Sequence, residues 1–318
     1  MQLSTPRIFS REEIEQVIQR SEVLTAIEAG FVLYSMGEVQ TPSTTHLQFE
    51  NPDGEVHLKA GYIVGEPYYV INVVSGFFNN YATYGLPNND GLMLLHRRET
   101  GELVAILLDH GLLTDIRTAA AGAIAAKYLA PRHVTAIGIV GTGTQARLQL
   151  AWLSEVIDCT EVVVWGRSEE RLAQYVEDMG DQYHITTTLE MSYLTERCNL
   201  IVTTTASKAP LLFAEQIQPG THITAIGADI AGKQELDPRI LYSADLVVAD
   251  SINQCLEFGE LSNASEMLLR VTELGSVIEN PYLQRQNDNQ ITVADLTGIA
   301  AQDAKIATLV YRRLLERE

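Results

Sequence analysis

The chain has 318 residues, of which 46% are hydrophobic and 20% are charged, and its formal net charge is −19. Such a chain can bury a large core and favours two domains, whereas its acidic balance argues against nucleic-acid or anionic-membrane partners. Three separated cysteines indicate a reducing compartment. No signal-like start, bilayer-length apolar stretch or metal-ligand spacing is present, so we expect a cytoplasmic protein without a metal site.

The first third of the chain predicts two helices and then a mostly antiparallel β region. Ser10 and Glu13 form a capping-box pattern, which predicts a helix from residue 11 to about 19. A second helix is expected over 22–35. From 43 to 109, segments rich in β-branched and aromatic residues alternate with turn signals, which predicts strands.

Strands and helices alternate from about residue 114 onward. An alanine-rich segment that ends before Pro131 predicts a helix, and "VTAIGIV" predicts a strand that leads into a further helix. Later strand segments are "TEVVVWG", "NLIVTTT", "HITAIGA" and "DLVVAD", and the chain closes with a long amphipathic helix. This alternation predicts an α/β fold with a doubly wound parallel sheet of the Rossmann type.

The turn between the strand and helix near residue 141 has the pattern of a dinucleotide-binding loop. Gly141 permits a tight turn, Gly143 lets the backbone approach a pyrophosphate, and Ala146 allows close helix packing. Thr144 and Gln145 then provide N–H groups at the positive end of the helix dipole. An ordinary tight loop is the alternative, but the alternating elements on both sides favour nucleotide binding.

The end of the next strand indicates which nucleotide binds. An acidic residue there would bind the ribose 2′-hydroxyl of NAD, but this chain has Arg167 and Ser168 after Gly166. A guanidinium can pair with a 2′-phosphate, and a hydroxyl can add a hydrogen bond. NADP(H) is therefore favoured and NAD(H) stays possible; a solvated Arg followed by a helix-capping Ser is the alternative interpretation.

Several segments together resemble the ornithine cyclodeaminase/μ-crystallin family over about residues 20–315. The resemblance implies a Rossmann domain at 117–295 and an α+β substrate-binding and dimerisation domain at 1–116 with 296–318, hence a homodimer. The segments are "GLPNNDGLMLL", "LLTDIRTAAAGAIAAKYLAP", "IGIVGTGTQARLQL", "VVVWGRS", "IVTTTASKAPLL", "GTHITAIGADIAGKQELDP" and "VADS".

The resemblance also implies roles for individual residues. Arg117 falls where the family binds a substrate carboxylate and a cofactor phosphate, and Asp229 matches the acidic catalytic residue. The other positions implied to contact the cofactor are Asn88, Asn89, Thr118, Thr204, Ile226, Gly227 and Lys233, in addition to Arg117 and Asp229.

Two positions depart from the family pattern. Thr44 stands where an Arg is usual, and Asn72 stands where a Lys is usual; both are retained as substrate-binding candidates. Lys59, on a neighbouring predicted strand, is a candidate catalytic and substrate-binding cation that replaces them in part. A solvent-facing Lys59 is the alternative, and we expect structural roles for His46 and His57.

These observations lead to a hypothesis about activity. We expect NADP(H)-dependent reduction of a C=N bond in a small cyclic ketimine or imino acid, with Asp229 assisting protonation. An ornithine- or lysine-type cyclodeaminase and an amino-acid dehydrogenase are the alternatives within enzymes. A non-catalytic NADPH-binding protein is the alternative outside them.

Overall fold

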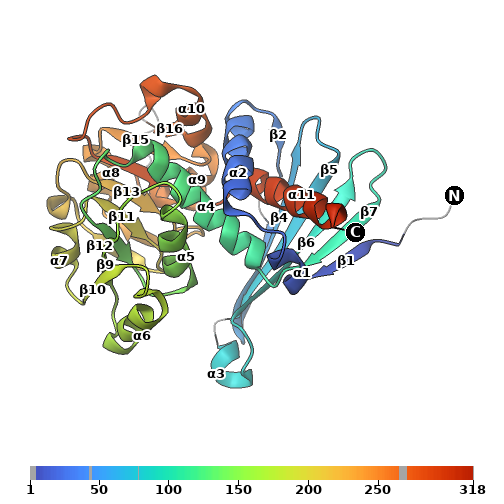
Figure 1. The fold of residues 1–318 in the computed structure, drawn as a ribbon, viewed down its shortest axis with the longest axis horizontal. Helices are drawn as coiled ribbons and strands as arrows, with labels where there is room; N and C mark the ends of the chain where they lie inside the picture. Colours follow the sequence, from blue (N-terminus) through green and yellow to red (C-terminus); the bar gives the residue numbers. More distant parts are fainter. Residues whose placement is uncertain (1–4, 43–44, 78, 265–270, 318) are drawn as a thin grey trace. The chain divides into compact units, whose positions relative to one another are not determined.

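The computed structural model describes residues 5–42, 45–77, 79–264 and 271–317 (Figure 1). The chain divides into two compact units, and each is described by itself. The first unit comprises Met1–Arg117 and Ile299–Glu318, and the second comprises Thr118–Gly298. Helix α4 (Leu112–Leu129) runs from the first unit into the second.

The first unit is built on a mixed sheet with the strand order β1-β7-β6-β5-β4-β2, and β3 also pairs with β4. The β1–β7 pair is parallel and the remaining pairs are antiparallel, which confirms the predicted mostly antiparallel region. The elements of this unit, besides α4, are β1 (Arg7–Ser10), α1 (Arg11–Glu15), α2 (Arg20–Ser35), β2 (Val39–Gln40), β3 (Thr45–Glu50), β4 (Asp53–Ile63), β5 (Tyr68–Phe77), α3 (Asn80–Tyr84), β6 (Asn89–Arg97), β7 (Leu103–Leu108) and α11 (Ala300–Glu316).

The C-terminal helix α11 returns to the first unit and packs on β4, β5 and α2 (Figure 1). A Cβ at Gly61 would lie 2.8 Å from the Ala300 carbonyl oxygen, so glycine permits this close approach of strand and helix. Lys305 and Arg312 of α11 each bind Glu66 at 3.1 Å, and Arg313 pairs with Glu22. These contacts join the C-terminal helix to residues near the start of the chain.

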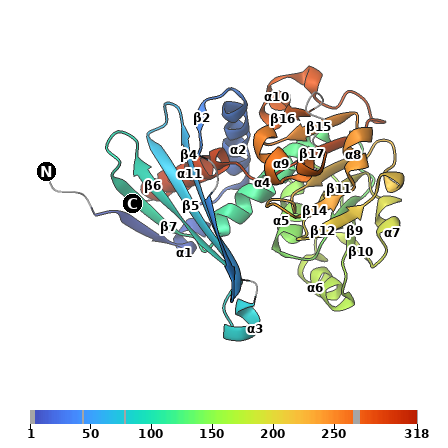
Figure 2. The same cartoon turned by 180° about the vertical axis from the view of Figure 1, so that it is seen from behind.

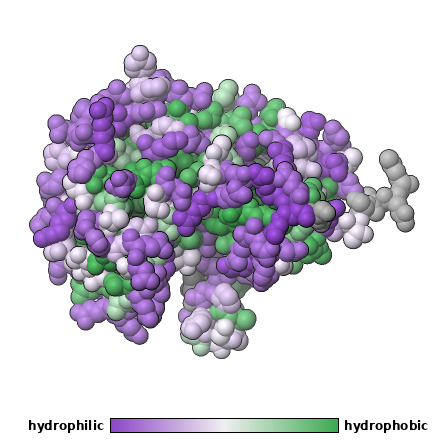
Figure 3. All heavy atoms as spheres, in the orientation of Figure 1, coloured by the Kyte–Doolittle hydropathy of each residue, from purple (hydrophilic) through white to green (hydrophobic). Residues whose placement is uncertain are grey.

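The sheet of the first unit has one helix-covered face and one apolar face that α2 and α11 do not reach. Figure 2 looks at this second face, with β4, β5 and β6 in front of α11. Figure 3 shows the opposite side, in the orientation of Figure 1, and most of the side chains visible there are hydrophilic, with hydrophobic patches between them. Strand register places one row of apolar side chains across the uncovered face: Ala60, Ile71, Leu94, Ile106 and Ile8.

The second unit is built on a parallel sheet with the order β10-β9-β8-β11-β13-β17-β15-β16, which confirms the predicted Rossmann-type sheet. A separate parallel pair joins β12 to β14. The elements are β8 (Ile137–Val140), α5 (Thr144–Leu153), β9 (Glu161–Trp165), α6 (Glu169–Met179), β10 (His184–Thr188), α7 (Met191–Thr195), β11 (Leu200–Thr203), β12 (Lys208–Leu212), β13 (His222–Ala225), β14 (Gln234–Leu236), α8 (Pro238–Ser243), β15 (Leu246–Ala249), α9 (Ile252–Phe258), β16 (Val271–Glu273), α10 (Leu274–Glu279) and β17 (Thr292–Asp295), with 3₁₀ turns at Ala214–Gln216, Glu260–Asn263 and Pro281–Leu283.

One local expectation needs correction, and several short strands had no prediction. The capping box of α1 is present, with Ser10 and Glu13 bonded reciprocally, but the helix ends at Glu15 instead of continuing to about 19. After Glu15 the chain makes a tighter turn, in which the Val17 N–H donates to the Ile14 carbonyl at 3.2 Å. No strand was predicted for β1, β2, β10, β12, β14, β16 or β17, and β17 lies between β13 and β15 in the sheet. Among the described helices, none is long and apolar enough to cross a membrane.

Candidate functional site

The glycine turn after β8 forms the floor of a hollow in the second unit. Gly141 adopts a φ of 123°, and a Cβ there would meet the Thr204 hydroxyl at 2.7 Å. Gly143 is the N-cap of α5 and no side chain caps that helix, so its first N–H groups keep their hydrogen-bonding capacity for another partner. The hollow has a volume of about 400 Å³ and is lined by Thr142, Gly143, Thr144, Arg147 and Leu148.

Arg147 holds this turn in place, a role that the sequence analysis missed. Its guanidinium donates to the carbonyl oxygens of Thr142 (2.5 Å) and Gly143 (3.2 Å). Asp178 of α6 binds the same guanidinium at 2.6–2.7 Å, and the ring of Tyr175 lies beneath it. A cation on the wall of the hollow suits an anionic ligand. In the sequence, only the position of Arg147 four residues after Gly143 could have indicated this role.

The end of β9 presents Gly166, Arg167 and Ser168 at the same edge of the sheet. A Cβ on Gly166 would meet the Thr142 methyl group at 2.9 Å, so this glycine keeps the two loops close together. Arg167 is exposed, and within the described part of the chain no hydrogen bond or ion pair holds its guanidinium. The Ser168 hydroxyl accepts from the Arg171 N–H at 3.4 Å and so caps α6.

The ends of β11 and β13 complete this edge of the sheet. The Thr204 hydroxyl donates to the Val140 carbonyl at 3.0 Å, and the Ile226 N–H donates to the Thr203 carbonyl at 3.1 Å. Ala146 is buried, as close packing of α5 requires. Within the same unit, Gln149 links α4 and α5, because its amide donates to the Thr118 carbonyl and to the side chain of Gln145.

Asp229 and Lys233 lie beyond the end of β13 and are ion-paired. The Lys233 ammonium is 2.8 Å from an Asp229 carboxylate oxygen, and the side chain of Asp229 is 52% exposed. This geometry leaves a carboxylate available to a cationic group at the edge that also carries the glycine turn.

The residues at this edge fit a dinucleotide. The uncapped start of α5 and Arg147 suit a pyrophosphate, and Gly141 and Gly143 leave room for it. Arg167 can meet a ribose phosphate at the end of β9. Of the predicted cofactor residues in the second unit, those brought to this edge are Gly141, Gly143, Thr144, Gln145, Ala146, Arg167, Ser168, Thr204, Ile226, Gly227, Asp229 and Lys233.

Arg117 is buried in the first unit and is already engaged. Its guanidinium donates to Asp303 at 3.1 Å and to the Gln302 side chain at 3.4 Å, both at the start of α11. The other oxygen of Asp303 is buried and has no partner among the described residues. The predicted role of Arg117 as a carboxylate and phosphate ligand stays a prediction.

Lys59 and Asn72 face each other on neighbouring strands, at the helix-covered side of the sheet. Asn72 is 2% exposed, and its amide donates to the Thr114 hydroxyl of α4 at 2.9 Å, so it has a structural partner. Lys59 is half-buried. The substrate-binding candidate Thr44 lies outside the described residues.

The predicted cofactor residues Asn88 and Asn89 lie at the α3–β6 junction and are exposed. The Asn88 side chain accepts from the Tyr81 N–H at 2.9 Å, which holds the short helix α3. Asn89 begins β6 and pairs with Gly76. Neither contact tests a role at the cofactor.

Two histidines of the first unit lie near Lys59. His46 and His57 are cross-strand neighbours with their rings 6.1 Å apart, and His57 approaches Glu55 at 3.5 Å. Their expected structural roles stay a prediction.

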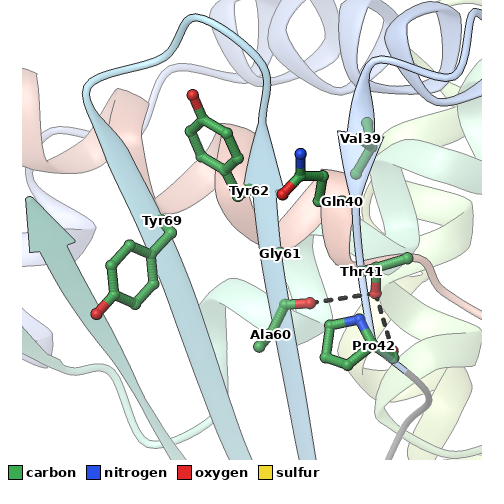
Figure 4. A pocket seen from close by; sticks show the side chains of 8 residues that line it. All are labelled: Val39, Gln40, Thr41, Pro42, Ala60, Gly61, Tyr62 and Tyr69. Atoms are coloured by element: carbon green, nitrogen blue, oxygen red, sulfur yellow. Dashed lines mark hydrogen bonds between the residues drawn. The ribbon is translucent and has the colours of Figure 1, made fainter. Parts of the chain in front are cut away.

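A second hollow, of about 530 Å³, opens beside the edge strand β2 (Figure 4). Figure 4 shows Tyr62 and Tyr69 on adjacent strands and Gln40 and Thr41 across from them. The Thr41 hydroxyl donates to the Ala60 carbonyl at 3.1 Å. No Lys, Arg, Asp or Glu lines this hollow in the described structure, so it has no ionic partner for a substrate carboxylate.

Among the described residues of the second unit, four carboxyl groups are almost completely buried and lie at or just beyond the carboxyl edge of the sheet: Asp250, Glu260, Asp295 and Glu235. The carboxyl of Glu260 accepts from the N–H groups of Glu235 (2.7 Å) and Leu236 (3.1 Å), and Asp295 accepts from Leu261 at 2.9 Å. Burial raises the pKa of Glu260 to about 9 and that of Asp295 to about 7. These groups satisfy backbone donors instead of facing solvent.

Comparison with known proteins assigns the family. The profile of the ornithine cyclodeaminase/mu-crystallin family matches residues 5–318. The chain belongs to this family. An uncharacterized cyclodeaminase of Sinorhizobium fredii is 36% identical, over 99% of this chain and 98% of that protein.

Two solved structures share the whole fold. The structure of an archaeal alanine dehydrogenase dimer with bound NAD is 35% identical, with a TM-score of 0.88 over 98% of this chain and 97% of that one. The Δ1-pyrroline-2-carboxylate reductase of Thermococcus litoralis, in complex with NADH and L-proline, is 27% identical. Its TM-score is 0.89, and 98% of each chain is covered. The family and the fold implied by the sequence are thus confirmed.

The buried carboxyl groups predict a pH dependence of stability. Glu260 keeps its proton in the fold up to about pH 9, whereas the unfolded chain loses it near 4.5. The folded state therefore binds more protons across this window, so the free energy of unfolding falls as pH rises, by at most about 1.4 kcal/mol per pH unit for one group. We expect Glu260→Gln to show a smaller loss of Tm between pH 5.5 and 8.5 than the wild type. Equal losses in the two proteins would contradict the raised pKa.

Proposed function

We propose that this protein reduces the C=N bond of a small cyclic ketimine or imino acid with a nicotinamide cofactor. The observation that carries the proposal is the Asp229–Lys233 pair at the same sheet edge as the Gly141–Thr144 turn. That edge combines a dinucleotide-binding geometry with a carboxylate that can face a cationic substrate atom. The reductase and dehydrogenase named above, solved with NADH and NAD, support the reaction class.

Asp229 and Lys233 of the second unit are the proposed groups for charge stabilisation and proton transfer. When bound, the nicotinamide supplies or accepts the hydride. A protonated imine is the better hydride acceptor, and the Asp229 carboxylate would stabilise its positive charge. Lys233, at 2.8 Å from Asp229, places an ammonium proton beside that carboxylate, so the pair can assist protonation of the imine nitrogen.

Arg117 and Lys59 are the proposed cations for the substrate carboxylate. Arg117 offers a planar, bidentate guanidinium, and Asp303 and Gln302 fix its orientation. Lys59 stands across from Asn72 on the neighbouring strand and provides a second cation. Holding the carboxylate fixes the imine carbon, which lowers the entropic part of the barrier.

A spectrophotometric assay tests the activity directly. We expect the wild-type protein to oxidise NADPH or NADH in the presence of a five- or six-membered cyclic ketimine carboxylate. Asp229→Asn should lower kcat by at least about 100-fold, since removing a general acid–base typically costs 10²–10⁴-fold. Its Kd for the nucleotide should change far less than its kcat. A variant with near wild-type turnover would contradict the role of Asp229.

The same assay separates the alternatives within the family. The relative named a cyclodeaminase favours testing that reaction beside the reductase. Release of ammonia from ornithine or lysine, without net consumption of nucleotide, would identify a cyclodeaminase. Oxidation of an amino acid with net reduction of nucleotide would identify a dehydrogenase. Binding of nucleotide without any turnover would identify a binding protein.

We further propose that NADP(H) is preferred over NAD(H). The supporting observation is the exposed Arg167 after β9, where no carboxylate stands at Gly166 to repel a 2′-phosphate. Ser168 adds a hydroxyl beside it, although that hydroxyl also caps α6.

Exchanging the charge at position 167 tests this preference. Arg167→Asp should weaken NADPH binding by at least about tenfold, because a charge-assisted hydrogen bond contributes on the order of 1.5–3 kcal/mol. Binding of NADH should be less affected, as titrations of both nucleotides would show. Arg171→Asp, in the first turn of α6, is the matched control and should leave the preference unchanged. Equal losses for both nucleotides would contradict a contact with the 2′-phosphate.

We also propose a homodimer in which a second copy covers the uncovered sheet face of the first unit. Ile8 is 60% exposed and ends the apolar row that crosses β4, β5, β6 and β7. A contiguous apolar row of this kind indicates an interaction surface. The structure described as an alanine dehydrogenase dimer supports a second copy as the occupant.

A charge in the middle of the row should break the dimer. Leu94 lies between Ile71 and Ile106 in the register, so Leu94→Glu would bury a carboxylate against the second copy. We expect dimers for the wild type and monomers for the variant in sedimentation experiments. Tyr282→Glu, at an exposed position of the second unit, is the control and should remain dimeric. A monomeric wild type or a dimeric Leu94→Glu would contradict this interface.

A further inference from the structure

Glu235 is the one member of the four buried carboxyl groups whose side chain contacts the predicted cofactor loops. It lies in β14 and is fully buried. One carboxylate oxygen accepts from the Thr203 hydroxyl at 2.6 Å and from the Gly227 N–H at 2.8 Å. The other accepts from the Thr205 N–H at 2.6 Å. One side chain thus binds three donors from two loops.

The two loops follow β11 and β13, and both carry predicted cofactor residues. Thr203 and Thr205 flank Thr204, whose hydroxyl lies against the glycine turn at Val140 and Gly141. Gly227 precedes Asp229 by two residues. Glu235 therefore joins the loop that supports the glycine turn to the loop that presents the Asp229 carboxylate.

The local sequence is adapted to this contact. A Cβ on Gly227 would lie 2.5 Å from the Glu235 carboxylate and 2.1 Å from the Thr205 carbonyl, so only glycine allows this approach. The three donors need two acceptor oxygens, which a carboxylate provides. A glutamine would turn its NH₂ group toward at least one of the donors and leave that donor buried without a partner.

We infer that Glu235 is a positioning residue for the nicotinamide nucleotide, which it serves by fixing the spacing between the loops after β11 and β13. The inference rests on the proposed function, because it assumes that these loops hold the nucleotide. Glu235 itself is fully buried, and its carboxylate oxygens bind Thr203, Thr205 and Gly227. Its effect on the ligand would pass through Thr204, Gly227 and Asp229.

Glu260 provides a matched comparison for a merely structural role. It is an equally buried acid in the same unit, and its carboxyl also accepts two backbone N–H groups. Those groups belong to Glu235 and Leu236 of β14 and not to either loop. Loss of a buried acceptor should destabilise both variants, but only the change at Glu235 should alter the loops.

The experiment combines nucleotide titration with hydrogen exchange. We expect Glu235→Gln to raise the Kd for NADPH at least tenfold and to speed amide exchange at residues 203–207 and 225–229 in the nucleotide-free protein. Thr203→Val should raise the Kd by a smaller factor, and Thr203→Ser, which keeps the hydroxyl, should restore it. Glu260→Gln should lower Tm yet leave the Kd within twofold of the wild type.

Each outcome decides the inference. A Glu235→Gln protein with wild-type Kd and wild-type loop exchange would overturn it, and so would equal losses of affinity in Glu235→Gln and Glu260→Gln. If Glu235→Gln does not fold, the Thr203→Val and Thr203→Ser pair carries the test alone. If the wild type binds neither NADPH nor NADH, the proposed function fails, whereas the exchange data still show whether Glu235 holds the two loops.

Discussion

The carboxyl edge of a parallel sheet leaves backbone N–H groups in its loops that must find acceptors away from water. In this protein, buried carboxyl groups meet that need: Glu235 holds the loops after β11 and β13, and Asp250 accepts from the N–H groups of Thr297 and Gly298. Burying an ionised carboxylate costs free energy, and for this reason burial raises the pKa of Glu260. The gain is a rigid edge on which the glycine turn, Thr204 and Asp229 have defined positions.

Much of the fold was predictable because its signals are local. Hydrophobic periodicity, the capping box at Ser10 and the alanine-rich sequence of α4 are signals within a few residues of one another, and the helices predicted from them begin near their expected residues. The failures have physical causes. Helix α1 ends at Glu15, where the Val17 N–H donates to the Ile14 carbonyl in a tighter turn. The strands that were not predicted are short, and the place of β17 between β13 and β15 depends on distant partners.

Candidate site residues could be proposed from the sequence only where the residues of a binding pattern lie together in one short segment. The glycine turn and the end of β9 could be read from their residues, since phosphate binding needs glycine, N–H groups and cations in one short segment. Arg147 and Glu235 could not be recognised in this way. Their roles depend on contacts with Asp178, Thr203 and Gly227, which the sequence does not bring together. The pairing of Arg117 with Asp303 likewise joins residues far apart in the chain.

We propose that a nicotinamide dinucleotide binds across the carboxyl edge of the second unit. Amide hydrogen exchange of the wild-type protein with and without NADPH tests it most directly. We expect slower exchange, on adding nucleotide, in four separate segments: 141–147, 166–168, 203–206 and 225–229. An unchanged exchange pattern, or protection confined to segments away from these strand ends, would contradict it.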